Sequence, residues 1–416
     1  MKQRFLIASV GSLGDALPYL HLAQQLQGIG HEVRLFCNEE HRARIERAGI
    51  EFVSAGLDLA YESTLQNPNL WHPVKGMGVL WRGLLAPCIV PLYQTIRDLP
   101  GGCKNWHVIA GPQMLGARLA QEHLGARLIS VYTAPNMLRT CIAPTTVAHT
   151  YWPKYTPRWL VSAMWAAVDR YKLDPMARST LTRICTELAI KPPPQHISLF
   201  GQWVHSTERG ITLYPAWFSP VPKDQPDHIV SGDFPLPAHS NASGVLSYEL
   251  QAFLQSGRPP IVVMLGSAMQ HAAHLYARWL EAALSAGQRA ILISADASQL
   301  PSTKHTDVLT IAFAPFETLL PQASVLIHHG GIGSCIQALS AGIPQIVQPH
   351  SHDQFENARC AQALGAALRL GRDASAQQMH HILLAALRPE CQTAAKAAQA
   401  KMPANGLARL GHLIAS

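Results

Sequence analysis

The sequence predicts an α/β protein of two domains, each built on a doubly wound parallel sheet. Three observations support this prediction. The chain has 416 residues, more than one hydrophobic core usually supports. Short apolar runs alternate with segments of helical periodicity in both halves. In each half a glycine-rich turn, at 11–14 and at 330–333, joins an apolar run to a helix.

Composition narrows the class of protein. Apolar residues make up 48% and charged residues 14%, as in globular proteins. The net charge is +7 without any run of five like charges, which favours anionic substrates or an acidic membrane surface over nucleic acid. Eight cysteines show neither CxxC pairs nor zinc spacing, which indicates reduced thiols. We find no signal peptide and no uninterrupted apolar span of about 18 residues, so we expect a cytoplasmic protein.

The first half begins with a strand, a glycine loop and a helix. Further strands and helices alternate after it, as expected for a parallel sheet. The predicted elements are a strand at 5–10, the loop at 11–15, a helix at 17–29, a strand at 33–36, a helix at 39–48, a strand near 52, a helix at 79–99, a strand at 108–110, a helix at 115–124 and a strand at 127–131.

The middle of the sequence departs from this alternation. Residues 134–200 form a predicted insertion in which aromatic and basic side chains are interleaved. The aromatic residues are Tyr151, Trp152, Tyr155, Trp159, Trp165 and Tyr171, and the basic ones are Lys154, Arg158, Arg170 and Lys172. Such aromatic side chains either pack the insertion onto its domain or contact acyl chains and a membrane surface. Many prolines then indicate a semi-rigid linker. The predicted boundaries are 1–220 for the first domain, 221–240 for the linker, 241–395 for the second domain and 396–416 for a C-terminal helix that returns to the first domain.

The second half contains strands at 261–265, 290–293 and 308–312 and closes on a glycine-rich unit at 324–370. There an apolar run leads through His329, Gly331 and Gly333 to a helix that begins near Ser334. Unpaired N–H groups and the helix dipole at such a turn bind phosphate. The turn lacks the GxGxxG spacing of dinucleotide sites and the lysine of a Walker loop. Tight strand-to-helix packing is the alternative interpretation.

Two further groups of polar residues are candidates for chemistry. Asp353 and Gln354 either cap a helix or bind adjacent hydroxyls of a sugar. Asp15 follows the first glycine loop and is either a helix N-cap or a general base. Hydrolase motifs are absent, and His271 and His274 without a third ligand do not indicate a metal site.

The run HGGIGSCIQALSAGIPQIVQPHSHDQFENA resembles the C-terminal donor signature of the nucleotide-sugar-dependent glycosyltransferases of family 1. The resemblance implies the GT-B architecture, in which two Rossmann-like domains face each other across a cleft. The first domain then binds the acceptor and the second binds the nucleotide sugar. The donor-binding positions implied in this way are Gly14, Ser267, Phe313, His329, Gly331, Gly333, Ser334, Asp353 and Gln354.

Within that family the sequence is most similar to bacterial rhamnosyltransferases of the rhamnolipid type. The similarity includes GSLGDALPYLHLA near the start, QWVHS at 202–206 and LYPAWFSP at 213–220. It implies transfer of L-rhamnose from dTDP-L-rhamnose to a 3-(3-hydroxyalkanoyloxy)alkanoate, which gives a rhamnolipid. His205 and Trp217 are the acceptor-binding residues that it suggests.

The catalytic positions differ from those of plant members. Asp15 stands where plant members carry a catalytic histidine, and Gly111 replaces the aspartate that supports that histidine. The two changes agree, because a carboxylate base needs no second carboxylate to orient an imidazole. Phe313 and Phe316 represent the plant residues that contact uracil, so the nucleobase stays open between thymine and uracil.

We therefore expect an inverting glycosyltransferase with Asp15 as its base, no cofactor and no metal. The expected partners are a nucleotide sugar and a hydrophobic small-molecule or lipid acceptor, with peripheral association at the inner face of the membrane and no nucleic acid. The alternatives are a UDP-glucose-dependent transferase acting on flavonoids or other aglycones, a UDP-sugar 2-epimerase, and a non-enzymatic partner protein. Retention of Asp15 with Asp353 and Gln354 disfavours the last of these.

Overall fold

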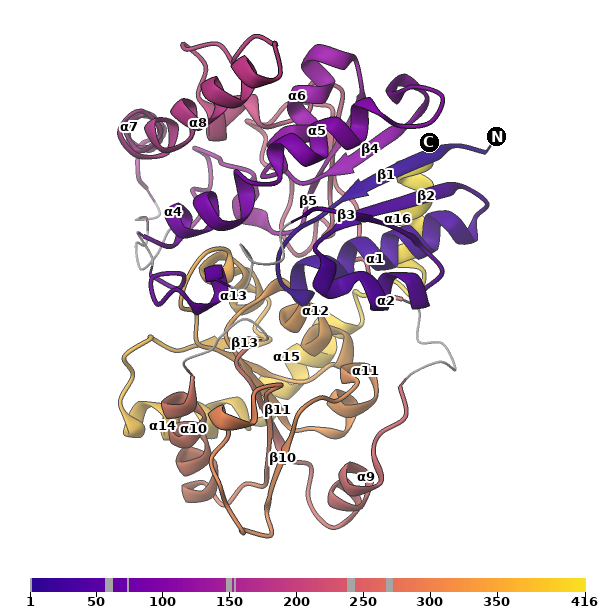
Figure 1. Ribbon diagram of the computed structural model, residues 1–416. Helices are drawn as coiled ribbons and strands as arrows, with labels where there is room; N and C mark the ends of the chain where they lie inside the picture. The colour runs from indigo at the N-terminus through magenta and orange to yellow at the C-terminus, as the bar shows by residue number, and fades with distance from the viewer. Residues whose placement is uncertain are drawn as a thin grey trace. The chain divides into compact units, whose positions relative to one another are not determined.

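A computed structural model describes residues 2–56, 63–72, 75–146, 152, 155–237, 244–266 and 272–416. The polypeptide forms two compact units, each with one parallel sheet (Figure 1). Unit 1 comprises Met1–Leu236 together with Gly406–Ser416, and unit 2 comprises Pro237–Asn405. This is the predicted arrangement of two α/β domains.

The sheet of unit 1 has seven strands in the order β3-β2-β1-β4-β5-β6-β7, all parallel. Its strands are β1 (Arg4–Ala8), β2 (Glu32–Cys37), β3 (Glu51–Ser54), β4 (His107–Ala110), β5 (Arg127–Tyr132), β6 (Arg209–Thr212) and β7 (Ile229–Val230). Successive residues of β1 enter different cores: Leu6 and Ala8 pack in one cluster, and Phe5 and Ile7 in another. Both faces of the sheet are therefore covered, as parallel sheets require.

The helices of unit 1 connect these strands and cover the two faces. They are α1 (Leu13–Gly28), α2 (Arg42–Arg47), α4 (Gly76–Leu80), α5 (Ile89–Arg97), α6 (Leu115–Leu124), α7 (Arg158–Val168), α8 (Asp174–Glu187) and α16 (Gly406–Ala415), with 3-10 turns η1 (Glu39–His41), η3 (Cys103–Asn105) and η4 (Pro135–Met137) and π-helical segments η2 (Trp81–Leu85), η5 (Asp169–Leu173) and η6 (Leu199–Trp203).

The helical stretch Gly76–Arg97 is long and apolar enough to cross a membrane by length and composition alone. Its apolar side chains nevertheless lie in the core of unit 1, where Trp81, Ile89 and Leu92 are each at most 2% exposed. A π-helical segment and a turn lie within it, so the helical stretch predicted at 79–99 is present but is not one regular α-helix. We conclude that this stretch is a core element of the unit.

The C-terminal helix α16 packs beside α1 (Figure 1). Leu410 and Ile414 of α16 join the core cluster that contains Phe5 and Ile7. Arg409 forms an ion pair of 2.9 Å with the buried carboxylate of Asp233. The last residues of the sequence thus complete unit 1.

Unit 2 has a six-stranded sheet in the order β10-β9-β8-β11-β12-β13, again wholly parallel. Its strands are β8 (Ile261–Met264), β9 (Ala290–Ile293), β10 (Val308–Ile311), β11 (Val325–His328), β12 (Gln345–Val347) and β13 (Ala367–Arg369). Its helices are α9 (Tyr248–Gln255), α10 (Ala273–Ser285), α11 (Phe316–Leu319), α12 (Ile332–Ala341), α13 (Gln354–Ala363), α14 (Ala376–Ala386) and α15 (Pro389–Gln399), with 3-10 turns η7 (Ala297–Gln299) and η8 (Leu320–Gln322).

Each sheet has one point where the strand order reverses. In unit 1 it lies between β1 and β4, and in unit 2 between β8 and β11. Ligands of open α/β sheets bind beyond the carboxyl ends of the strands at this point. The two glycine-rich turns follow β1 and β11, so both predicted sites occupy a switch point.

Two segments differ from the sequence prediction. Residues 221–236, expected as linker, belong to unit 1, where the two-residue strand β7 pairs with β6. A strand this short among prolines has no periodicity that a sequence could reveal. The helix expected at 396–416 is interrupted, because α15 ends at Gln399 and α16 begins at Gly406.

We predict that Leu410→Ala will lower the free energy of unfolding of unit 1 by about 2–5 kcal/mol, because the substitution leaves a cavity in a filled core. Leu410 is 1% exposed. Leu384→Ala on α14 is the matched control, because that leucine is 42% exposed. Urea unfolding of both variants measures the difference, and equal stability would contradict the role of α16.

Candidate active site

Asp15 lies in the first turn of α1, where Ser12 is the N-cap residue. The backbone N–H of Ser12 donates to Asp15 Oδ2 at 2.9 Å, and the Ser12 hydroxyl donates to the same oxygen at 2.8 Å. Asp15 is therefore the third helical residue and not the N-cap. Its carboxylate orientation is fixed by two hydrogen bonds, as a general base requires.

The glycine before this turn makes the carboxylate position possible. Gly11 has a φ of +135°, and a Cβ atom there would lie 2.6 Å from Asp15 Oδ2. Buried side chains hold its peptide groups: the N–H donates to Asn38 Oδ1 at 3.1 Å, and the carbonyl accepts from Asn38 Nδ2 at 3.0 Å. His41 Nε2 lies 3.0 Å from the same carbonyl. A larger residue at position 11 would displace the carboxylate.

The protein environment raises the pKa of the Asp15 carboxyl above its usual 3.8. Desolvation is the largest cause, while the hydrogen bonds from Ser12 and the field of His41 oppose it. Asp15 as a residue is nevertheless exposed. A carboxylate with a raised pKa is a stronger base than a free one and stays accessible to a substrate.

The second turn is anchored by polar side chains inside unit 2. His328 is fully buried, with Nε2 at 2.9 Å from Gln345 Oε1 and Nδ1 accepting from the N–H of Gly330 at 3.1 Å. The carbonyl of Gly330 accepts from Asn357 Nδ2 at 3.0 Å. Gly330 itself has a φ of +98°. Its peptide groups are thus fixed on both sides, which sets the direction in which α12 starts.

His329 lies between two glycines. A Cβ at Gly266 would approach His329 Cε1 to 2.7 Å, and a Cβ at Gly331 would approach His329 Nε2 to 2.7 Å. The ring therefore packs against both the turn that follows β8 and the turn that follows β11. His329 Nδ1 is buried and has no hydrogen-bond partner. Burial, with the nearby His328 and His350, lowers the pKa of His329 to about 3, so the imidazole is neutral at pH 7 and donates through one N–H.

The N-terminus of α12 has no capping side chain. Cys335 makes the first helical bond, to the carbonyl of Gly331, so the N–H groups of the preceding turn have no partner inside the helix. A Cβ at Gly333 would meet no atom within 4 Å, and Ser334 lies in this first turn. Exposed N–H groups at the positive end of a helix dipole bind phosphate.

The segment around Asp353 has a partly structural role. Asp353 is the N-cap residue of α13, and its Oδ2 accepts from Asn357 Nδ2 at 2.7 Å. Gln354 is 2% exposed, and its amide oxygen accepts from the N–H groups of His350 at 2.8 Å and Ser351 at 3.1 Å. That oxygen already accepts two hydrogen bonds from the loop. Only the amide N–H groups of Gln354 are left for the predicted pairing with sugar hydroxyls. Asp353 is half-buried at the surface of the site.

The other predicted donor residues are distributed between the two units. Phe313 follows β10 in unit 2 and is 68% exposed, so its ring is free to stack on a base. Gly14 lies in unit 1, in the exposed first turn of α1 beside Asp15. Gly111 directly follows β4 at the switch point of unit 1. Ser267 and His271 lie outside the described residues.

The two predicted acceptor residues, His205 and Trp217, both lie in unit 1 but contact different side chains. His205 Nδ1 lies 3.0 Å from the hydroxyl of Tyr132, and burial lowers the pKa of His205 to about 4. Trp217 is half-buried and makes edge contacts with Phe218 and Phe234, at ring distances of 6.4 and 5.7 Å. Trp217 therefore continues an aromatic cluster, whereas His205 is held next to the start of β6.

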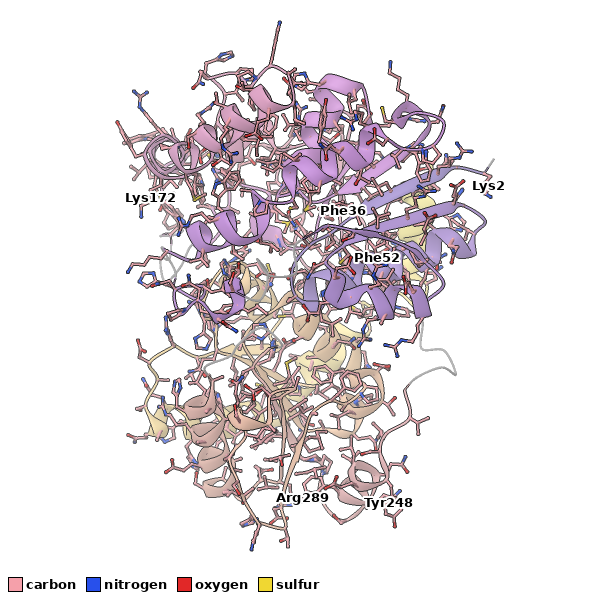
Figure 2. The ribbon with its side chains drawn as sticks, in the orientation of Figure 1. Lys2, Phe36, Phe52, Lys172, Tyr248 and Arg289 are labelled. Carbon is pink, nitrogen blue, oxygen red and sulfur yellow. The ribbon has the colours of Figure 1, made fainter. Side chains whose placement is uncertain are left out.

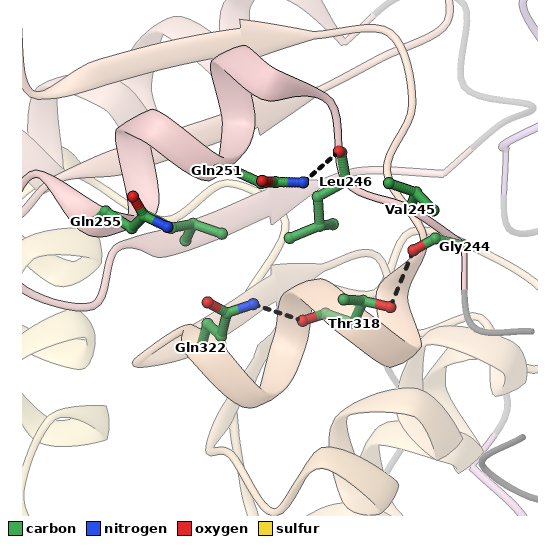
Figure 3. Close-up of a pocket in the computed structure, with 8 residues that line it drawn as sticks. Gly244, Val245, Leu246, Gln251, Gln255, Thr318 and Gln322 are labelled. Atoms are coloured by element: carbon green, nitrogen blue, oxygen red, sulfur yellow. Dashed lines mark hydrogen bonds between the residues drawn. The ribbon is translucent and has the colours of Figure 1, made fainter. Parts of the chain in front are cut away.

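Two surface pockets involve none of these residues. One, of about 360 Å³, lies between α9 and the α11–η8 segment, with Leu246, Gln251 and Thr318 in its lining (Figure 3). The other, of about 440 Å³, is lined by residues that include Arg34, Pro91 and Asp98. Neither pocket includes the glycine turn that follows β1 or β11.

Sequence reasoning missed the side chains that hold the turns. Asn38 and His41 follow β2, and His328 with Gln345 lies inside the core of unit 2. For Asn38 and His328 the available signal was a polar residue placed directly after, or at the end of, a buried strand. Among the described residues no cluster of three metal-ligating side chains occurs.

Comparisons with known proteins identify the class to which this fold and site belong. A model of the glycosyltransferase family 28 N-terminal domain matches residues 5–88. A model of the erythromycin biosynthesis protein CIII-like C-terminal domain matches residues 278–409. The glycosyltransferase of kitacinnamycin has a TM-score of 0.71 at 19% identity, covering 100% of this sequence and 99% of the other. The protein has the GT-B fold.

The particular family follows from a closer relative. L-demethylnoviosyl transferase of Streptomyces niveus is 37% identical over 387 residues, which span 89% of this sequence and 86% of the relative. A spinosyn rhamnosyltransferase, SpnG, solved with thymidine diphosphate has a TM-score of 0.65 at 18% identity, and the match covers 100% of both proteins. The protein belongs to the family 1 glycosyltransferases. It is an enzyme that transfers a sugar from a nucleotide sugar to a small-molecule acceptor.

We predict that Ser12→Ala will move the acidic limb of the kcat/KM profile to higher pH by roughly 0.5–1 unit, because the Asp15 carboxylate loses a hydrogen bond that lowers its pKa. With Asp15 as the predicted base, we expect activity to fall as the pH drops through the raised pKa of this carboxyl. Ser9→Ala is the control, because that hydroxyl bonds the Asp15 backbone carbonyl at 3.0 Å. An equal shift in both variants would contradict the assignment.

We predict that His329→Ala will weaken binding of the free nucleoside diphosphate about tenfold, because one hydrogen bond to a charged phosphate is lost. Calorimetry with dTDP and UDP measures the change. His305→Ala, at an exposed histidine of the same unit, should leave the Kd unchanged. Unaltered binding by a folded His329→Ala protein would remove His329 from the phosphate site.

Proposed function

We propose that this enzyme is an inverting glycosyltransferase that moves L-rhamnose from dTDP-L-rhamnose to a hydroxyl of a 3-(3-hydroxyalkanoyloxy)alkanoate. One observation supports the reaction type above all others. A hydrogen-bonded, exposed carboxylate follows β1 at the switch point of one sheet, and an uncapped helix N-terminus follows β11 at the switch point of the other. These are the base and the leaving-group site that a glycosyl transfer needs.

In the proposed reaction Asp15 removes the proton of the acceptor hydroxyl while the oxygen attacks the anomeric carbon. A new C–O bond forms on the face opposite the diphosphate, and the bond to the diphosphate oxygen breaks, so the configuration inverts. The raised pKa of Asp15 brings this carboxyl closer to the pH at which general bases are most efficient. Ser12 donates two hydrogen bonds to Oδ2 and thereby holds the carboxylate in a defined direction.

The negative charge that develops on the departing diphosphate is stabilised from unit 2. The first-turn N–H groups of α12 and one N–H of the neutral His329 are in place before the reaction, and each such donor contributes on the order of 3 kcal/mol. Asp353 is proposed to accept a hydrogen bond from a sugar hydroxyl. In this proposal the helix dipole and the imidazole replace a metal ion, so no cofactor is required.

The choice of donor rests on resemblance. The exposed ring of Phe313 offers a stacking surface for a thymine or uracil base. SpnG is a rhamnosyltransferase that was solved with thymidine diphosphate, and it shares the fold of this protein. Together with the rhamnolipid-type motifs in the first 220 residues, this supports dTDP-L-rhamnose.

The acceptor is proposed to be a hydroxylated lipid, and the enzyme to work in the cytoplasm at the inner face of the membrane. The half-buried Trp217, in contact with Phe218 and Phe234, provides an apolar surface suited to acyl chains. His205 is proposed to contact the polar part of the acceptor, next to Tyr132.

We predict that Asp15→Asn will lower kcat by about 10²-fold or more and leave donor binding nearly unchanged, because the amide cannot take up the proton. Rapid-quench kinetics and calorimetry separate the two quantities. Glu40→Gln, at an exposed acid in η1, is the matched control and should keep full turnover. A fully active Asp15→Asn enzyme would refute the base assignment.

The substrate is identified by thermal stabilisation with a panel of dTDP- and UDP-sugars, because a ligand at 100 times its Kd adds about 2.7 kcal/mol of stability. The expected result is the largest shift with dTDP-L-rhamnose, followed by product formation with a hydroxyalkanoyl acceptor. A larger shift with UDP-glucose, and transfer to a flavonoid, would replace the proposed donor and acceptor.

A further inference from the structure

Residues 155–172 expose an unusual number of large apolar side chains. Tyr155 is 86% exposed, Trp159 70%, Leu160 44% and Tyr171 74%. Single exposed apolar residues are common, but several within one short segment mark an interaction surface. We call this segment the aromatic surface.

The exposed side chains belong to one continuous stretch of backbone: Tyr155 precedes α7, Trp159 and Leu160 lie in its first turn, and Tyr171 lies in η5. The backbone is helical from α7 through η5 into α8. Within α7 only Val161 is buried. Trp159, Ala163 and Ala166 follow each other at spacings of four and three residues and form one exposed stripe, with Leu160 beside it. The small alanines leave the tryptophan ring prominent. This helix therefore packs on unit 1 through a narrow contact and presents an apolar face outward.

In the same segment the acidic side chain faces the protein interior and the basic side chains face outward. Its acid, Asp169, faces inward: it is 6% exposed and accepts from Arg139 and Ser198 at 2.5 Å each. Asp174, which follows the segment at 8% exposure, accepts from Arg178 at 3.0 Å and from a backbone N–H at 3.1 Å. Both carboxylates are thereby paired inside the protein.

The bases of the segment face outward. Arg158, Arg170 and Lys172 are exposed, and Figure 2 shows Lys172 at the outer edge of unit 1. No acid of 155–172 is exposed to offset them. The aromatic surface consequently carries a positive field as well as an apolar stripe.

We infer that the aromatic surface binds the surface of an anionic lipid bilayer. Trp and Tyr rings are stable at the boundary between headgroups and acyl chains, and an amphipathic helix lies there with its apolar face about 5–10 Å deep. Arg158, Arg170 and Lys172 then lie at the level of the lipid phosphates, and each base adds attraction to negatively charged headgroups. This inference deepens the membrane association proposed above, because it names the surface and the lipid class, and it does not depend on the identity of donor or acceptor.

The test is co-sedimentation of the full-length protein with vesicles of phosphatidylcholine alone and with roughly 30% phosphatidylglycerol. We expect binding to the anionic vesicles that weakens as salt is raised. Trp159→Ala with Tyr171→Ala should reduce the partition coefficient at least about tenfold. Arg170→Gln with Lys172→Gln should reduce it roughly 30-fold, about fivefold for each charge.

Matched controls come from unit 2. Tyr248→Ala removes a tyrosine that is 88% exposed on α9, and Arg258→Gln with Lys401→Gln removes two exposed bases. Both control proteins should sediment like the unaltered protein. Equal binding to neutral and anionic vesicles, or equal loss in the controls, would overturn the inference. Lipid-free self-association that Trp159→Ala abolishes would also overturn it, in favour of an interface between copies of the protein.

The same variants separate this inference from the proposed reaction. Transfer to a water-soluble short-chain hydroxy acceptor in lipid-free buffer should be unchanged, because the substitutions lie outside the catalytic residues. If the unaltered protein binds anionic vesicles but transfers no rhamnose, the proposed donor or acceptor fails and the lipid surface stands. If it transfers rhamnose but ignores the vesicles, the lipid surface fails alone.

Discussion

The hydrogen bonds that fix Gly11 and Gly330 are the constraint on which the two sites depend. Each glycine has a positive φ and follows a central strand of its sheet. A glycine in this position loses much conformational freedom on folding, so it stays in one conformation only when its peptide groups are fixed. The buried amide and imidazole groups that bond them do so, and they thereby set where the Asp15 carboxylate and the start of α12 lie.

In both units, asparagine and histidine side chains hold the glycine of the turn by hydrogen bonds. In unit 1 an asparagine bonds both peptide groups of Gly11, and a histidine bonds its carbonyl. In unit 2 the N–H of Gly330 donates to a histidine and the carbonyl accepts from an asparagine. These polar side chains are nearly or fully buried, and buried polar groups are stable only when they are hydrogen-bonded. The glycine peptide groups give these buried side chains their hydrogen-bond partners, and the same bonds hold the turn in place.

Much of the fold and the position of both glycine turns could be predicted from the sequence, because strand–turn–helix periodicity and glycine runs are local signals. They located β1, β11 and the helices after them, and with them Asp15, His329 and Gly331. What could not be predicted depends on contacts between distant residues. The bonds of Asn38 to Gly11 span 27 residues, as does that of Asn357 to Gly330. The strand β7 was assigned to a linker because pairing with β6, and not periodicity, makes it a strand.

The return of α16 to unit 1 has a consequence for biosynthesis. Because Gly406–Ser416 packs with Met1–Leu236, the polypeptide leaves one folding unit, builds the whole of another and then comes back. During synthesis the residues of unit 2 leave the ribosome before α16 does. Unit 2 can therefore fold first, while the core cluster that contains Phe5 and Ile7 still lacks Leu410 and Ile414. Gln3, which precedes β1, donates to the carbonyl of Ala415 in α16 at 3.0 Å, so the first strand and α16 are also joined by a hydrogen bond. The order of synthesis and the order of folding of these two units therefore differ.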